Sequence, residues 1–239
     1  MDNIKEFFLE LLFPSFCLGC KKEGVLLCQD CKATLEISEY NYCLCSQNPL
    51  RLPAFLGTCS RCTGRKLSGL YFALPYKERF LTRKLIYQFK YEPYLKNLSK
   101  VLAGVLLEHF VLAKNASANI WENSVLIPVP LQIKKQKDRG YNQAQEIAKE
   151  LGQTLNVPFI FDNLAKIKTT APQMELSAKE RQGNLVGAFA IKNPAQIAGK
   201  KVFLVDDVYT TGSTMEECAR ILKEAGAKSV RGIAIAREG

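Results

Sequence analysis

Residues 202–214 read Val-Phe-Leu-Val-Asp-Asp-Val-Tyr-Thr-Thr-Gly-Ser-Thr, and this stretch decides the predicted fold. Its apolar start is typical of a buried strand, which brings two adjacent acids, Asp206 and Asp207, to the carboxyl end of that strand. A loop of small and hydroxylated residues follows and opens directly onto a helical pattern: Thr210, Thr211, Gly212, Ser213 and Thr214. Backbone N–H groups at a helix N-terminus point at an incoming anion, and the helix dipole favours its negative charge.

The side chains of this stretch predict a pocket for a phosphorylated, hydroxylated sugar. The loop hydroxyls add hydrogen-bond donors, and Gly212 lets the backbone approach a phosphate closely. The two carboxylates would suit ribose hydroxyls and a Mg²⁺ ion. The alternative is an ordinary strand–turn–helix unit with acids at the strand end, although ligands of α/β proteins usually bind there.

The order of these parts resembles the phosphoribosyl pyrophosphate (PRPP) motif of the type I phosphoribosyltransferases, in which four apolar residues precede two acids and a Thr/Gly/Ser loop. The resemblance implies that Asp206 and Asp207 bind the ribose and that residues 210–214 bind its 5′-phosphate. The motif is specific for the ligand and much less specific for any reaction.

Length and composition predict a cytoplasmic protein of one medium domain plus a smaller one. The chain has 239 residues, of which 47% are hydrophobic, and it has no run of 18 apolar residues that could span a membrane. Residues 1–14 carry acids where a signal peptide would carry basic residues. Their apolar spacing predicts a short amphipathic helix that ends near Pro14 and docks on the protein.

Eight of the nine cysteines lie in the first 62 residues, in four close pairs: Cys17 and Cys20, Cys28 and Cys31, Cys43 and Cys45, Cys59 and Cys62. In a reducing compartment, such pairs favour Zn²⁺ held by thiolates over disulfides. The simplest grouping is sequential, with the first four cysteines in one Cys₄ site and the last four in another. An interleaved grouping and buried free thiols are the alternatives. Cys218 lies on an apolar helical stripe and is predicted to be a core residue.

Charge separates the cysteine-rich region from the rest of the chain. The protein has 33 basic and 23 acidic residues, a net charge of +10, yet residues 1–65 contain seven of each kind. The whole surplus therefore lies downstream. We predict a zinc module over residues 1–65, structural or used for docking, and a larger domain over residues 66–239 that carries the basic surface.

Residues 76–100 combine seven basic residues with six aromatic ones. Cations that neutralise phosphates, placed between rings on which bases stack, are typical of single-strand binders, so Arg83, Lys84 and Lys90 are candidate DNA contacts. The same residues fit a helix with one buried face, in which most rings belong to the core. His109, the only histidine, is predicted to be a half-buried helix residue.

A second strand–loop–helix unit follows at residues 124–155. Its predicted basic loop, Gln132 to Gly140, carries four cations: Lys134, Lys135, Lys137 and Arg139. Because a helix capped by Asn142 comes next, the unit would hold a pyrophosphate well. A solvated basic loop is the alternative.

The remaining patterns predict an α/β fold with a mainly parallel sheet flanked by helices. Strands are expected at residues 67–73, 157–161, 186–191, 201–205 and 230–236, alternating with helices. Residues 166–184 are too polar for a core and predict a flap over an active site.

Four segments together resemble the ComF (ComFC) family, over nearly the whole chain from Phe13. They are the paired cysteines, Phe89-Lys90-Tyr91, Pro128-Val129-Pro130 with residues 139–144, and a spaced set that precedes the Asp-Asp loop: Gln173, Leu176, Arg181, Asn184 and Phe189. The spacing Cys43-x-Cys45 departs from the two intervening residues that are common in the family. The resemblance implies a zinc-finger module joined to a type I phosphoribosyltransferase-like domain, a role in DNA uptake during natural transformation, and a competence helicase as a partner.

Three functions are compatible with this interpretation. The leading one is a competence protein that binds PRPP or a related phosphorylated ribose at residues 206–214. It would also bind single-stranded DNA through its basic surface, with contacts from Arg83, Lys84, Lys90, Lys134 and Lys137. The second is an active phosphoribosyltransferase. There a nitrogen nucleophile would displace pyrophosphate from Mg²⁺-PRPP, with Asp206, Asp207 and Arg139 as catalytic residues and Lys135 stabilising the leaving group. The third is a regulator that senses PRPP without turning it over.

Overall fold

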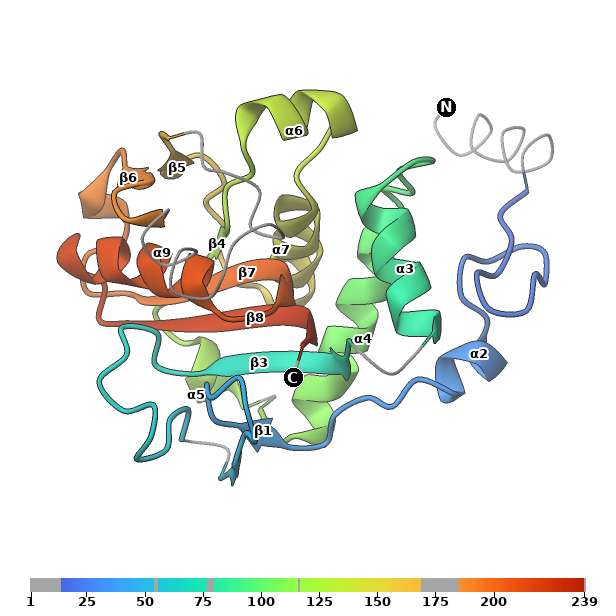
Figure 1. The fold of residues 1–239 in the computed structure, drawn as a ribbon, viewed down its shortest axis with the longest axis horizontal. Helices are drawn as coiled ribbons and strands as arrows, with labels where there is room; N and C mark the ends of the chain where they lie inside the picture. The colour runs from blue at the N-terminus through green and yellow to red at the C-terminus, as the bar shows by residue number, and fades with distance from the viewer. Residues whose placement is uncertain (1–13, 54–55, 77–79, 116, 169–184, 239) are drawn as a thin grey trace.

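The computed structural model describes residues 14–53, 56–76, 80–115, 117–168 and 185–238, and its centre is a six-stranded sheet of order β2–β1–β3–β8–β7–β4 (Figure 1). Four neighbouring strands are parallel: β3 (Leu70–Pro75), β8 (Ser229–Arg237), β7 (Lys201–Tyr209) and β4 (Ser124–Pro128). The predicted α/β class with a mainly parallel sheet is confirmed.

The cysteine-rich segment supplies the edge of this sheet. Its two short strands, β1 (Asn41–Tyr42) and β2 (Arg51–Leu52), pair with each other antiparallel, and β1 continues antiparallel onto β3. The same segment also contains the short helix α2 (Gln29–Ala33). The part of the chain that carries the metal-binding pattern is thus hydrogen-bonded to the central sheet.

Three helices cover one face of the sheet: α3 (Phe80–Lys90), α4 (Leu98–Leu112) and α7 (Gln143–Leu155). In α7 the apolar residues fall three and four positions apart, so one face is buried, and the Asn142 side chain caps the helix by accepting a bond of 3.0 Å from the Ala144 N–H. In the core on this face, helix residues such as Leu85, Leu102 and Ile147 pack against alternate residues of the strands, such as Phe203, Val205 and Ile233.

The other face is covered by α9 (Ser213–Glu224) and by a separate two-stranded sheet of β5 (Leu164–Lys166) and β6 (Phe189–Ile191). The expectation that residues 186–191 extend the parallel sheet is wrong, because β6 pairs antiparallel with β5. Cys218 is fully buried on this side, so its predicted place in the core is confirmed. The core here also contains Cys43, Leu44 and Cys62.

Several local expectations need correction. The predicted basic loop is the helix α6 (Ile133–Arg139), which ends where Gly140 adopts a φ of 77°. The predicted strand at residues 157–161 makes a single parallel bridge, from Phe159 to Leu126. His109 is fully buried, with its ring Nδ1 2.6 Å from the Ser38 carbonyl oxygen.

The other described elements are a short helix, α5 (Ala118–Trp121), and one turn of 3₁₀ helix, η2 (Pro194–Gln196). Among the described residues, no helix has the length and apolar character needed to cross a bilayer. The predicted N-terminal helix and most of the predicted flap lie outside the described residues.

Candidate functional site

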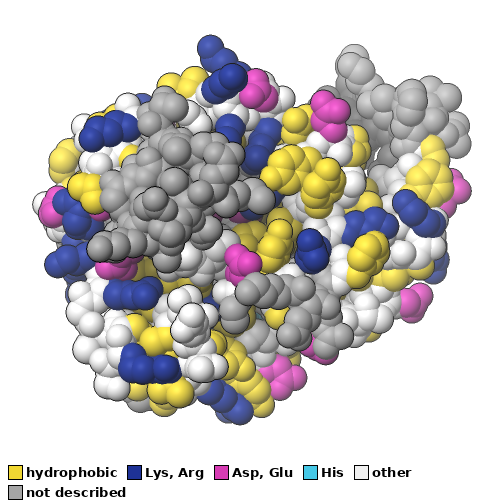
Figure 2. Space-filling model, viewed as in Figure 1, with side chains coloured by type: hydrophobic (Ala, Val, Ile, Leu, Met, Phe, Trp, Pro, Cys, Tyr) yellow, Lys and Arg dark blue, Asp and Glu magenta, His cyan; other side chains and the backbone are white. Residues whose placement is uncertain are grey.

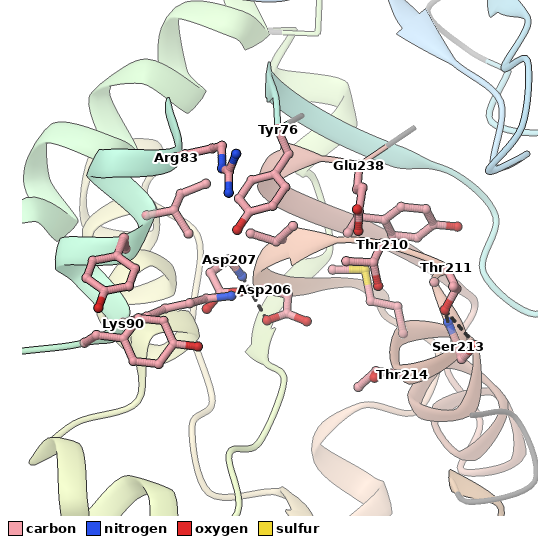
Figure 3. A pocket seen from close by; sticks show the side chains of 17 residues that line it. Tyr76, Arg83, Lys90, Asp206, Asp207, Thr210, Thr211, Ser213, Thr214 and Glu238 are labelled. Atoms are coloured by element: carbon pink, nitrogen blue, oxygen red, sulfur yellow. Dashed lines mark hydrogen bonds and ion pairs between the residues drawn. The ribbon is translucent and has the colours of Figure 1, made fainter. Parts of the chain in front are cut away.

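A cleft of about 700 Å³ opens at the carboxyl end of β7, between α3 and the start of α9 (Figure 3). Figure 3 shows the two acids at its centre, with α3 side chains on one side and the hydroxyl-bearing loop on the other. All the acids and loop residues predicted for the sugar pocket line it: Asp206, Asp207, Thr210, Thr211, Gly212, Ser213 and Thr214. The structure therefore brings this predicted set together in one cavity.

The acids lie within the strand and not beyond it. β7 runs four residues further than predicted, to Tyr209, because its parallel neighbour β8 also continues and pairs Asp206 with Ala234 and Tyr209 with Arg237. The Asp207 backbone N–H donates a bond of 2.8 Å to the Asp206 carboxylate. Both acids are consequently held by the sheet ladder, which fixes their backbone before any ligand binds.

The two carboxylates have different electrostatic environments. The Lys90 ammonium of α3 lies 2.7 Å from the Asp207 carboxylate. Burial, together with repulsion from Asp207, raises the pKa of Asp206 to about 7, although Lys90 and the Asp207 N–H oppose this rise. Burial would lower the pKa of Lys90, but attraction to Asp207 and Asp206 outweighs burial and raises it. One acid is thus ion-paired and the other titrates near neutral pH.

The hydroxyl loop connects the strand to α9 through a left-handed glycine. Gly212 has a φ of 79°, and a Cβ at this position would lie 2.2 Å from the Tyr209 hydroxyl oxygen. Both the backbone conformation and the contact with the tyrosine therefore require glycine here. The Thr211 and Ser213 hydroxyl oxygens are hydrogen-bonded to each other at 2.9 Å, and α9 begins at Ser213. The loop thus brings its hydroxyls to the N-terminus of α9, beside the cleft.

Some basic residues predicted for nucleic acid also line this cleft. Arg83 and Lys90 both face it from α3, whereas Lys84 lies over the ring of Phe80, 5.7 Å from its centroid. Sequence reasoning missed four tyrosines and an acid that also line the cleft: Tyr76, Tyr87, Tyr91, Tyr209 and Glu238. The motif Phe89-Lys90-Tyr91 was the signal in the sequence that could have placed α3 in the site.

The residues of α6 lie outside the lining of this cleft in the described chain. Lys134, Lys135 and Lys137 are exposed on the helix. Arg139 is nearer the cleft: its guanidinium donates a bond of 3.0 Å to the Gln143 side chain and lies 5.5 Å from the ring centroid of Tyr91. Figure 2 shows basic side chains over α6 at the top of the view and hydrophobic side chains over α3 beside them.

The cysteines form two compact quartets in the sequential grouping. We call Cys17, Cys20, Cys28 and Cys31 the first quartet, and Cys43, Cys45, Cys59 and Cys62 the second quartet; in each, all four sulfurs lie within 4.8 Å of one another. A tetrahedral Zn²⁺ with bonds of about 2.3 Å separates its sulfurs by about 3.8 Å. The Sγ–Sγ distances of 3.5 Å between Cys20 and Cys28 and 3.6 Å between Cys45 and Cys59 are close to this value. Each quartet therefore fits a structural zinc ion.

The thiols of each quartet affect one another's protonation. Burial and neighbouring thiols raise the pKa of Cys31 and of Cys45 to about 12. Burial acts in the same direction on Cys17 and Cys59, but backbone N–H donors and neighbouring thiols outweigh it and lower both pKa values to about 6. Four thiolates this close need a cation to neutralise their repulsion, which is the role of the metal in a Cys₄ site.

Comparison with known proteins identifies a family for the part of the chain that contains the cleft. Residues 101–239 match the phosphoribosyl transferase domain family. The chain is 38% identical over 113 residues to "Competence protein F" of Haemophilus influenzae, over 47% of this chain and 49% of that protein. It is 32% identical over 147 residues to "DNA utilization protein YhgH" of Salmonella typhimurium, over 62% of this chain and 63% of that protein.

A third relative matches almost from end to end. The chain is 27% identical over 230 residues to "Competence protein ComFC" of Streptococcus pneumoniae, which covers 95% of this chain and 94% of that protein. The match to the Haemophilus and Salmonella proteins, by contrast, spans about half and less than two thirds of their lengths. The ComF-family resemblance seen in the motifs is confirmed by these relatives.

Proposed function

The chain belongs to the phosphoribosyl transferase domain family, and on that premise we propose that the cleft at the end of β7 binds PRPP or a related phosphorylated ribose. The observation that carries the proposal is the convergence of two sheet-held carboxylates and a hydroxyl loop at the N-terminus of α9 in one cavity. The 5′-phosphate would lie against residues 210–214, and the ribose hydroxyls against Asp206 and Asp207.

The basic residues of the cleft would bind the pyrophosphate together with Mg²⁺. Arg83 and Lys90 lie on the side of the acids opposite the hydroxyl loop, where the pyrophosphate of a ligand held at both acids would extend. Because Lys90 is paired with Asp207, a ribose that bonds to Asp207 releases the ammonium toward this phosphate. Mg²⁺ would take oxygen ligands from the pyrophosphate and the ribose, as hard cations prefer.

The second part of the proposal is a role in handling single-stranded DNA, in the cytoplasm, by a competence protein that carries zinc in both quartets. Reduced thiolates that persist as metal ligands are typical of that compartment. The exposed aromatics Phe80 and Tyr87 of α3, and Tyr91 directly after it, offer faces on which bases stack. The lysines of α6 offer charge for phosphates. A helicase of the competence machinery is the partner that the family suggests.

The first test is calorimetry of the wild-type protein with Mg²⁺-PRPP at two pH values. We expect binding at one site per chain that grows about tenfold stronger from pH 6 to pH 8, because a proton on Asp206, with its pKa of about 7, competes with the ligand. Above pH 8 the affinity should level off. The Asp206→Asn variant should keep only the smaller pH dependence of the ligand's own phosphates, and an equal dependence in the two proteins would contradict the assignment of Asp206.

Pyrophosphate release distinguishes turnover of PRPP from binding alone. A transferase incubated with Mg²⁺, PRPP and a panel of nitrogenous bases releases pyrophosphate with one of them. A protein that binds or senses PRPP without turnover releases none with any base. Family membership favours the transferase as the second candidate, in which Arg139, stacked on Tyr91 at the edge of the cleft, and Lys135 would act on the leaving group.

Single-stranded DNA binding should depend strongly on salt. Each phosphate contact gives a slope of about −0.7 in log K against log[salt], so reversing the charges of Lys134, Lys135 and Lys137 to Glu should flatten the slope by about 2. Reversal of Lys21 and Lys22, two exposed lysines beside the first quartet, is the matched control and should leave the slope unchanged. Salt-independent affinity for a short strand, or equal slopes in both variants, would contradict this part of the proposal.

A further inference from the structure

The second quartet is packed inside the protein, beside the phosphate loop. Cys43 and Leu44 are fully buried, and they share one hydrophobic core with Tyr209, which precedes the loop, and Met215, which follows it. The first quartet, in contrast, has an exposed Cys20, and its segment packs against the other core through Leu18, Leu26 and Leu27. Of the two quartets, the second therefore lies where it can affect the conformation of the phosphate loop.

A chain of hydrogen bonds joins the second quartet to the strand that enters the loop. The Tyr209 hydroxyl donates to the Leu44 carbonyl at 3.3 Å, and the Arg65 guanidinium donates to that same carbonyl and to the tyrosine oxygen, each at 3.2 Å. Leu44 lies between two of the cysteines, and the Tyr209 side chain is in close contact with Gly212. The backbone at the metal site thus sets the position of the ring under the loop.

Arg237 makes a second connection. The residue is 2% exposed, and its guanidinium donates to the Cys43 carbonyl at 2.8 Å and to the Cys45 carbonyl. The guanidinium lies 5.6 Å from the ring centroid of Tyr209. The backbone N–H of the next residue, Glu238, donates to the Tyr209 carbonyl at 2.8 Å. A buried cation is costly unless it has hydrogen-bond acceptors. The conformation of the end of β8 therefore depends on the positions of the two carbonyls on either side of Leu44.

The third connection reaches the helix that leaves the loop. Glu216, in the first turn of α9, accepts hydrogen bonds from the backbone N–H groups of Lys66 at 2.6 Å and Leu67 at 3.2 Å. These residues follow Cys62 closely in the chain. The segment around the second quartet consequently contacts both ends of the loop, at Tyr209 and at Glu216.

We propose that the second quartet and its metal hold residues 210–214 in the conformation that binds phosphate, and that the first quartet has no part in this. The inference deepens the proposed function, since it concerns the same loop. Tyr209, Arg237 and Glu216 act as positioning residues that transmit the geometry of the metal site. Without the metal, nothing joins the four cysteine sulfurs, so the carbonyls of residues 43–45 shift and the loop loses its support.

Hydrogen exchange of residues 209–216 tests this without any ligand. We expect Cys45→Ser to remove one zinc ion per chain and to speed exchange in these residues, whereas Cys20→Ser removes one zinc ion and leaves their exchange unchanged. Unchanged exchange in Cys45→Ser, with the zinc lost, would overturn the proposal. Equal acceleration in both variants would overturn it too.

If Cys45→Ser does not fold, the variant Tyr209→Phe tests whether the second quartet supports the phosphate loop. This variant loses only the hydroxyl bonds, so it should keep its zinc, exchange faster in residues 209–216 and bind PRPP about fivefold more weakly, the effect of one hydrogen bond of about 1 kcal/mol. Tyr40→Phe, in the same cysteine-rich segment, is the matched control. Wild-type exchange in Tyr209→Phe would reject the inference. If the wild-type protein does not bind PRPP, the proposed function fails, while the exchange data still decide the role of the quartet.

Discussion

Replacement of both Asp206 and Asp207 by asparagine is expected to lower the affinity for Mg²⁺-PRPP by at least about 100-fold. Each hydrogen bond to a charged group contributes about 1.5–3 kcal/mol, and the double variant loses such a bond at both carboxylates. It should nevertheless remain folded. Ionised Asp206 destabilises the ligand-free protein, since its pKa is raised to about 7 and its proton is bound more tightly in the folded state between about pH 4 and pH 7.

Two measurements check this result. Calorimetry gives the affinity, and thermal unfolding shows that the fold persists despite the loss of the ion pair between Lys90 and Asp207. Asp162→Asn, an equal change at an exposed position outside the lining of the cleft, is the control and should bind as the wild type does. Equal affinity for Mg²⁺-PRPP in the double variant and the wild type would contradict the proposal that PRPP binds in this cleft.

Loss of zinc from the first quartet is the other large effect that we expect. Binding of structural zinc by a small module contributes about 10–16 kcal/mol, which is folding energy, so Cys17→Ser should unfold the segment that contains this quartet and lower the zinc content by one ion per chain. The central sheet should stay folded, because Leu18 and Leu35 are the only described residues of this segment that are fully buried in its core.

Metal analysis and limited proteolysis check this prediction. Cys218→Ser, which changes a buried thiol outside both quartets, is a control for the metal content and should retain two zinc ions. Purified wild-type protein without zinc, or with its thiols oxidised to disulfides, would contradict the assignment. The division into residues 1–65 and 66–239 stays a prediction, which the position of the first proteolytic cut in Cys17→Ser also tests.

Local patterns in the sequence are sufficient for the central parts of the site. The apolar run before Asp206, the glycine and hydroxyls after it, and the close cysteine pairs all express their structure over fewer than about 20 residues, and the structure brings each set together. The strand predicted at residues 201–205 is too short. In the structure β7 continues through Asp206 and Asp207, and charged residues such as these do not fit the apolar pattern from which a buried strand is predicted. Its pairing with β8 decides where it ends.

The long-range features could not be predicted in the same way. The ion pair between Lys90 and Asp207 joins residues from distant segments, so no local pattern in the sequence predicts it. The many cations of Gln132 to Gly140 suggest a loop, although these residue types also favour helices and Gly140 supplies the ending. The support of the phosphate loop by Tyr209 and Arg237 depends on contacts with residues 43–45 that only the folded chain reveals.

The most direct test of the proposed PRPP site is the crystal structure of the protein soaked with Mg²⁺ and PRPP. We expect density for the 5′-phosphate against residues 210–214 and for the ribose hydroxyls beside Asp206 and Asp207, with the Lys90 ammonium moved toward the pyrophosphate. Density for PRPP at another place on the molecule, with this cleft free of ligand, would contradict the proposal.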